Sequence, residues 1–229
     1  MTSSLMVGID PCALCIRSLI RQEIHLEKRP IGRYDALMGK SEITRDAVLD
    51  AALHEASLTG VAQLTLGPVA AAAGRSKGGL LRHFPSKERL QIAVLERAFI
   101  RFQQHVFEPA LKAPNGLPRL RVIMECWFKW PESAGLPGGC PILSAHHEFD
   151  DLDSDVREHL HSAWSRWHTY LTRQAHKAQE ASQLPPELSP EALVTLMIGL
   201  KSAAQLEQRL LKHRDANRNA LQLFDRLTS

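Results

Sequence analysis

Five basic residues lie between positions 75 and 89, where Glu88 is the single acidic residue. The basic residues are Arg75, Lys77, Arg82, Lys87 and Arg89. Guanidinium and ammonium groups neutralise phosphates and donate hydrogen bonds to the major-groove edge of guanine. The formal net charge of the whole chain is only +3, so the clustering of charge, and not its total, predicts contact with nucleic acid.

Residues 65–88 predict the elements that present this charge, namely two short helices and the start of a long third one. Thr65 is expected to cap the first helix through its side chain, and Gly74 to end it in the left-handed conformation. Ser76 is expected to cap the second helix and Ser86 the third. Two short helices joined by a tight glycine turn form a helix-turn-helix, whose second helix enters the major groove of DNA.

The second helix carries the residues that would read DNA. Lys77 and Arg82 can donate to guanine or to phosphate, and Gly78 and Gly79 would let the backbone approach the duplex closely. Each glycine inside a helix costs about 1 kcal/mol relative to alanine. We therefore expect this helix to be soft when it is free of DNA.

Composition places the chain among soluble globular proteins, with 44% hydrophobic and 23% charged residues in 229. No apolar run approaches the roughly 20 residues that span a bilayer, so no membrane partner is expected. The four cysteines are too few and too scattered for a disulfide framework, which indicates a reducing cytoplasm.

The chain from residue 41 onward predicts an all-α fold. Residues 44–57 place apolar side chains on one helical stripe, and a long helix from Lys87 is expected to continue until Pro109 disturbs it. Near the C-terminus, Ser189 is expected to cap a helix that is apolar around almost its whole circumference. Such a helix must be buried on more than one side, and a partner subunit is the natural second side. The residues expected at this dimer interface are Leu193, Leu196, Met197, Leu200, Ala204, Leu221 and Phe224.

Tryptophans, histidines and a cysteine in the C-terminal half predict a ligand pocket. An apolar cavity with aromatic walls and a few polar groups would hold a lipophilic effector. For each of these residues alone, core packing is the competing interpretation. The candidates are Cys126, Trp127, Trp130, His146, Trp164, Trp167, His168 and Met197.

Cys140 supports a different hypothesis, a thiol-based sensor of oxidants or electrophiles. It lies just before a predicted helix, whose dipole would lower the pKa of the thiol and favour the thiolate. A buried and inert cysteine is the alternative.

Two clusters raise the question of metal binding. Cys12 and Cys15 have the spacing of half a zinc site, with His25 the nearby candidate for a further ligand. His146, His147 and Glu148 could join Cys140 and Cys126, but adjacent histidines on a helix point about 100° apart and rarely serve one ion. We expect neither a metal nor a cofactor.

Catalysis and a purely structural role are the remaining classes. Cys140 and His146 form the one plausible nucleophile and base pair, and the sequence has no Gly-x-Ser-x-Gly, phosphate-cradling or zincin motif, so an enzyme is not expected. A helical interaction module that does not bind DNA would use the helix-turn-helix as scaffold only.

Residues 1–40 do not resemble the remainder. They mix apolar residues with Pro11, Pro30 and Gly32, and we expect a disordered extension or a start site placed too early, with Met38 as the initiator.

Residues 41–112 closely resemble the tetracycline-repressor (TetR) family of transcriptional regulators. The matching motifs are T-R-D-A-V-L-D-A-A, V-A-A-A-A-G and S-K-G-G-L-L-R-H-F-P-S-K-E at the expected intervals. Residues G-G-C-P-I-L-S-A-H-H-E-F-D-D and Ser165-Arg166-Trp167 look, less specifically, like a subgroup of that family.

The resemblance implies a homodimeric repressor of a palindromic operator that is released by a small-molecule effector. It implies a three-helix DNA-binding domain at residues 41–86 and a helical effector-binding and dimerisation domain at 87–229. By position, Thr65 and Lys87 look like phosphate contacts. The groove-facing positions are Lys77, Gly78, Gly79, Arg82 and His83.

Two residues depart from the family's pattern. Leu81 stands where the family often has a phosphate-binding tyrosine, and Gly79 where it often has threonine. Because both changes remove hydroxyl donors, phosphate anchoring is expected to depend more on the basic residues.

Overall fold

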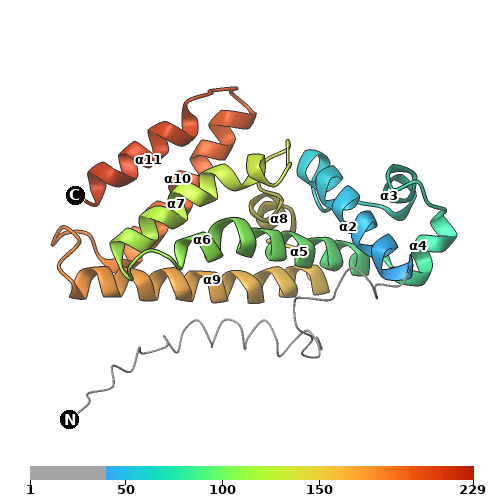
Figure 1. Cartoon of the computed structure of the whole chain (residues 1–229), viewed down its shortest axis with the longest axis horizontal. Coiled ribbons are helices and arrows are strands. Elements are labelled where there is room, and N and C mark those ends of the chain that lie inside the picture. The colour runs from blue at the N-terminus through green and yellow to red at the C-terminus, as the bar shows by residue number, and fades with distance from the viewer. Residues whose placement is uncertain (1–39) are drawn as a thin grey trace, which may run out of the picture. The chain divides into compact units, whose positions relative to one another are not determined.

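The computed structural model describes residues 40–229, and within this range the chain contains helices and no strand. The predicted all-α fold is therefore confirmed, and residues 42–229 form one compact unit. The elements are α2 (Lys40–Thr59), α3 (Leu66–Ala72), α4 (Lys77–His83), α5 (Lys87–Phe102), a π-helical segment (Gln103–Phe107), α6 (Glu108–Ala110), α7 (Leu117–Ser133), α8 (Pro141–Phe149), α9 (Asp155–Glu180), α10 (Pro190–Arg209) and α11 (Ala216–Leu227), shown in Figure 1. The predictions for Cys12, Cys15, His25 and Met38 lie outside the described residues.

Helices α2, α3 and α4 form a small group at one end of this unit (Figure 1). The side chain of Ser76 accepts a hydrogen bond from the Gly79 N–H at 3.1 Å, so the predicted cap of α4 is confirmed. Ser86 caps α5 in the same way. Thr65 stands at the N-cap of α3, but its side chain makes no capping hydrogen bond, which corrects that expectation.

The long helix that begins after Ser86 passes Pro109 instead of ending there. Proline lacks an N–H and its ring clashes with the carbonyl four residues before it. The chain widens to a π-helix over Gln103–Phe107 directly before the proline, and this accommodates the ring. Pro109 then occupies the first turn of α6, where no N–H is needed.

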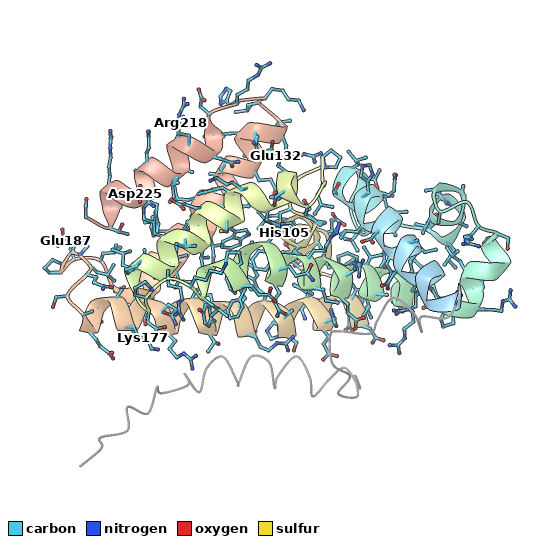
Figure 2. The ribbon with its side chains drawn as sticks, viewed as in Figure 1. His105, Glu132, Lys177, Glu187, Arg218 and Asp225 are labelled. Carbon is cyan, nitrogen blue, oxygen red and sulfur yellow. The ribbon has the colours of Figure 1, made fainter. Side chains whose placement is uncertain are left out.

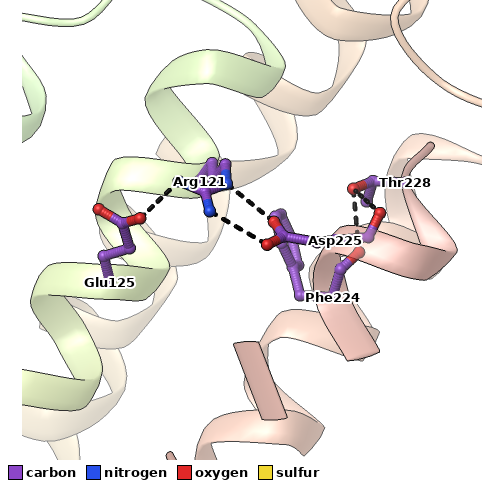
Figure 3. A network of polar contacts seen from close by, with 5 residues as sticks. All are labelled: Arg121, Glu125, Phe224, Asp225 and Thr228. Carbon is purple, nitrogen blue, oxygen red and sulfur yellow. Dashed lines mark hydrogen bonds and ion pairs between the residues drawn. The ribbon is translucent and has the colours of Figure 1, made fainter. Parts of the chain in front are cut away.

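Helices α7 and α9 pack on this long helix, α10 packs on α7 and α9, and α11 packs on α7 and α10. Pro131 lies inside α7 without ending it. Arg121 of α7 donates to both carboxylate oxygens of Asp225 on α11, at 2.8 and 3.1 Å, and pairs with Glu125 one turn along its own helix (Figure 3). These contacts fix the orientation of the terminal helix. Charged side chains such as Glu187 and Arg218 point away from the bundle (Figure 2).

No helix in the described part of the chain is both long enough and apolar enough to cross a membrane.

Candidate functional site

Helix α4 holds the predicted DNA-reading residues at the surface of the small N-terminal group. Its opposite face is anchored by Leu80, and by Phe84 directly after the helix, each 1% exposed. Because the inner face is fixed in the core, the outer face has a defined orientation. Of the predicted contacts, Gly79 and His83 are half-buried, and the exposed ones are Thr65, Lys77, Gly78, Arg82 and Lys87.

The charges on this face are available to a ligand. Lys77, Arg82 and Lys87 form no ion pair or side-chain hydrogen bond with any residue that the structure describes. Leu81 is 43% exposed on the same helix. This surface therefore offers cations that can pair with DNA phosphates. Its glycines let the protein backbone come close to the edge of the groove.

The turn at residues 60–62, between α2 and α3, is held by side chains of α8 and α5. The carboxylate of Glu148, on α8, accepts the backbone N–H of Ala62 at 2.6 Å. Burial raises the pKa of Glu148, and its hydrogen bonds from Ala62 and Val61 act in the opposite direction. Gln91 of α5 donates to the Val61 carbonyl oxygen at 2.9 Å. Helices α8 and α5 therefore both contact this turn.

A second contact holds the C-terminal end of α2. The N–H of Gly138 donates to the Ser57 hydroxyl at 3.2 Å, and Arg209 of α10 donates to the Ser57 carbonyl oxygen at 3.2 Å. A Cβ atom at position 138 would lie 1.4 Å from that carbonyl oxygen, so only glycine allows this approach. Helix α2 is thus seated against the loop before α8 and against α10.

The predicted pocket residues are partly brought together around Phe102, the last residue of α5. Its ring makes edge-to-face contacts with Trp127, Trp130 and Trp167, at centroid distances of 6.0, 5.5 and 5.2 Å. Trp164 lies 6.3 Å from Trp127. We call these five rings the aromatic cluster. The long helix from the DNA-binding group therefore ends inside the predicted effector region.

The remaining pocket candidates are distributed around this cluster. His146 of α8 lies with its ring 4.4 Å from that of Trp164, and Met197 is fully buried. Cys126 is half-buried on α7. His168 is exposed, and its Nδ1 atom lies 3.5 Å from the hydroxyl of Thr172 on the outer face of α9. Burial lowers the pKa of His146 to about 4, with a smaller contribution from His147, so its ring is neutral at pH 7.

Cys140 begins α8 as expected, and its sulfur accepts the Leu143 N–H at 3.4 Å. The expected lowering of its pKa is wrong, however, because the residue is 1% exposed and burial raises the pKa of the thiol. Lys201 and Trp130 are close enough to oppose this effect but do not overcome it. A helix terminus contributes about 0.3–1 kcal/mol at an exposed site, whereas desolvation of a buried charge costs several kcal/mol.

Lys201 is a functional candidate that the sequence analysis missed. It is 2% exposed, its Nζ atom lies 5.7 Å from the centroid of the Phe128 ring, and burial lowers its pKa. The signal was available in the sequence, since Lys201 interrupts an otherwise apolar helical run. Glu148 and Gly138 were also missed as the contacts to the end of α2 and to the turn after it. No local pattern marks residues that meet a partner about 80 positions away.

A metal site is not formed by the histidines and cysteines of the described residues, among which no group of three potential ligands is gathered. His147 is exposed whereas His146 faces the interior. The two side chains therefore point in different directions, as expected for adjacent residues on a helix.

The residues predicted at the dimer interface are mostly inside the protomer. Leu193, Met197, Leu200, Ala204 and Phe224 are at most 8% exposed, and Leu196 and Leu221 are half-buried. Packing of α10 on the other helices of its own chain already covers most of this apolar surface. The buried residues therefore have little area left for a partner.

A surface groove of about 520 Å³ runs between the C-terminal end of α2, helix α8 and helix α10. Leu206, Leu210, Glu148 and Ser57 are among the residues that line it. It therefore adjoins both contacts that hold the C-terminal end of α2 and the turn after it.

Comparison with known proteins gives a consistent family. Residues 48–94 match the profile of the bacterial regulatory proteins of the tetR family, and residues 116–224 match that of the tetracyclin repressor-like C-terminal domain. No curated protein sequence matches the chain.

Several solved structures share the fold. A TetR transcriptional regulator from Chloroflexus aurantiacus is 24% identical over 82% of this chain and 94% of its own, with a TM-score of 0.72. A TetR-family regulator from Cytophaga hutchinsonii is 22% identical over 83% of this chain and 96% of its own, with a TM-score of 0.69. AibR, solved with isovaleryl coenzyme A and operator DNA, is 19% identical over 81% of this chain and 98% of its own, with a TM-score of 0.66.

Proposed function

Because this chain belongs to the TetR family, and is thus a DNA-binding transcriptional regulator, we propose that it represses transcription as an effector-released homodimer on a near-palindromic operator. The observation that carries the proposal is the outer face of α4. Its cations are exposed and unpaired among described residues, while Leu80 and Phe84 fix its inner face. A rigidly seated helix with a free basic face is suited to the major groove.

The dimer in this proposal uses the outer faces of α10 and α11. Leu206 on α10 is 57% exposed and Leu210, directly after α10, is 70% exposed, and Leu223 and Leu227 on α11 are 45% and 43% exposed. Ala203 is exposed one turn before Leu206 and extends the same stripe. Ala203, Leu206 and Leu210 have the spacing of one helix face, and an exposed apolar stripe of this kind indicates an interaction surface. The proposed interface therefore consists mainly of these residues, with Leu196 and Leu221 at its margin.

The proposed effector enters the C-terminal domain at the aromatic cluster. Solved relatives include AibR, whose structure holds isovaleryl coenzyme A together with operator DNA. In this chain His146 faces the cluster, and Glu148, two residues further along α8, accepts a hydrogen bond from the turn between α2 and α3. A ligand that displaces α8 would therefore displace that turn, and a ligand with different affinity for the two arrangements shifts their populations.

The test is an operator shift assay with charge-removing variants. Lys77→Ala and Arg82→Ala should each weaken operator binding by roughly tenfold or more, since a good base or phosphate contact contributes about 1–3 kcal/mol. Lys129→Ala, an exposed lysine on α7, is the charge-matched control and should bind normally. Undiminished affinity of both α4 variants would refute the assigned reading face.

A further inference from the structure

The buried polar atoms of the effector region that lack a hydrogen-bond partner are mainly donors. His146 Nε2 also lacks a partner and can act in either role, and Asn217 Oδ1 is an acceptor. The unpartnered donors are Arg101 Nε, Trp127 Nε1, Trp167 Nε1 and Gln174 Nε2, whereas Trp130 donates to the Cys140 sulfur. A buried donor without an acceptor costs about 1–3 kcal/mol, so such an excess calls for a group that supplies acceptors.

A buried cation accompanies these donors. Lys201 is 2% exposed and forms no ion pair with any residue of the described chain. Its Nζ atom instead lies over the Phe128 ring. The buried polar side chains of the described residues include no Asp or Glu, so the protein's own interior offers this lysine no carboxylate. Buried charges are normally paired, because desolvation is costly.

The cation and the indoles belong to one region. Lys201 and Trp130 both lie close enough to Cys140 to act on its thiol. Trp130 in turn contacts Phe102, which contacts Trp127 and Trp167. A flat molecule that replaces part of this ring packing would therefore meet apolar faces, indole N–H groups and an ammonium group.

We infer that the effector is an anionic molecule with an apolar, preferably aromatic, body, whose acidic group is bound by Lys201 and whose acceptors take up the indole N–H groups of the aromatic cluster. This inference rests on the proposed function and names the chemical class of its ligand. Charge-assisted hydrogen bonds to an anion are stronger than neutral ones, and the apolar rings bury the body of the ligand.

An organic cation is the alternative class of ligand, since the faces of aromatic rings attract cations. Here Lys201 is buried near Cys140 and Trp130, and no buried carboxylate of the described residues offsets its charge. Like charge in a region of low dielectric disfavours a second cation. The charges of the described residues thus favour an anion.

Two fluorescent probes with the same skeleton test the inference. 1-Anilinonaphthalene-8-sulfonate is an anion, and N-phenyl-1-naphthylamine is the same molecule without its sulfonate. Both would be titrated into the full chain, with probe emission and tryptophan quenching as readouts. We expect the anion to bind roughly tenfold more tightly or better, a ratio equivalent to about 1.4 kcal/mol.

Single-residue variants test which side chains bind the anionic probe. Lys201→Met keeps a long apolar stem and should reduce affinity for the anion by roughly tenfold while leaving that for the neutral probe unchanged. Trp167→Phe removes one indole N–H together with part of the ring, so it should weaken binding of the anion more than that of the neutral probe, which keeps the test valid if Lys201→Met does not fold. Lys129→Met is the control and should match the wild type.

The outcomes separate this inference from the proposed function. If the neutral probe binds as tightly as the anion, or if neither Lys201→Met nor Trp167→Phe affects the anion, the inference is wrong while an interior effector site stands. If neither probe binds, the interior site and the inference both fail. A preference for a cationic probe such as an acridinium dye would assign the opposite class.

Discussion

The carboxylate of Glu148 shows how one residue can join two functions. It accepts the Ala62 N–H at 2.6 Å while it stands on the same short helix as His146, whose ring contacts Trp164. On a nine-residue helix, a shift at one of these residues must move the other, because residues two apart share one rigid turn. The link between effector region and DNA-binding group is therefore a single short element.

The buried ring of His146 makes stability depend on pH. Its pKa is about 4 in the folded protein, against an ordinary value of 6.5. Between these values the unfolded chain binds a proton that the folded chain does not, so stability is lost as the pH falls from 6.5 towards 4. The loss should reach about 3 kcal/mol by the lower limit, at 1.36 kcal/mol per pKa unit.

Urea unfolding of wild type and His146→Phe between pH 7 and pH 4 measures this contribution. The difference in unfolding free energy between the two proteins should shift in favour of the variant as the pH falls. A difference that stays constant across this range would show that His146 is not held neutral by burial.

At the scale of elements, the proposed recognition helix α4 is well packed on its inner face but has low helix propensity in its first turn. Ser76 caps α4 and Leu80 and Phe84 are buried, but two glycines occupy its first turn. A Cβ atom at Gly78 would meet nothing within 4 Å in the chain. Space inside the protein therefore does not require glycine at this position, and approach to the DNA backbone is the remaining physical reason for it.

Gly78→Ala should raise the unfolding free energy by up to about 1 kcal/mol, through the better helix propensity of alanine, and yet weaken operator binding. Gly199→Ala, in α10, also meets nothing within 4 Å and is the control for helix propensity. It should stabilise the protein by a similar amount, but it is not a control for operator affinity, because it lies on the proposed dimer surface. Urea unfolding of both variants and an operator shift assay on Gly78→Ala provide the measurement. Normal operator binding by Gly78→Ala would mean that the glycine is not needed for approach.

The helices and caps could largely be predicted because their signals are local. Ser76, Ser86 and Ser189 each cap a helix as predicted, through hydrogen bonds to the N–H groups three residues on. Thr65 has the right position but not the capping hydrogen bond, which depends on the rotamer of its side chain. The course of the chain at Pro109 depends on a π-helical turn that residue propensities do not encode.

The site was less predictable because it depends on which residues meet across the fold. The tryptophans could be identified as a group, but their arrangement around Phe102 requires α5, α7 and α9 to be placed together. The pKa of Cys140 depends on burial by several helices, which overrides the local effect of a helix terminus. Apolar periodicity on α10 likewise does not separate a face buried in the protomer from one that a partner could cover.

At the scale of the whole molecule, the proposed function requires two helix-turn-helix units at a fixed separation. Operator half-sites lie roughly 34–36 Å apart, about one helical turn of DNA. The proposed dimer surface on α10 and α11 would set this separation. The groove of about 520 Å³ places Leu206 and Leu210 beside the seat of α2, so the dimer surface and the domain junction are neighbours.

Leu210→Glu tests this arrangement. Leu210 is 70% exposed, so a charge there should leave the protomer folded while it disfavours burial against a second copy. Sedimentation equilibrium should change from a dimer to a monomer. Operator affinity should fall by roughly 10²-fold or more, because linked binding of two half-sites exceeds single-site binding by factors of about 10² to 10⁴.

Leu152→Glu is the matched control, since Leu152 is 48% exposed in the segment between α8 and α9 and away from the proposed surface. It should remain dimeric and bind the operator normally. A Leu210→Glu protein that stays dimeric would place the interface elsewhere. If Leu210→Glu is a monomer but binds the operator as tightly as the wild type, the bivalent mode of binding is wrong. A single helix-turn-helix with its few basic contacts would then be enough for binding.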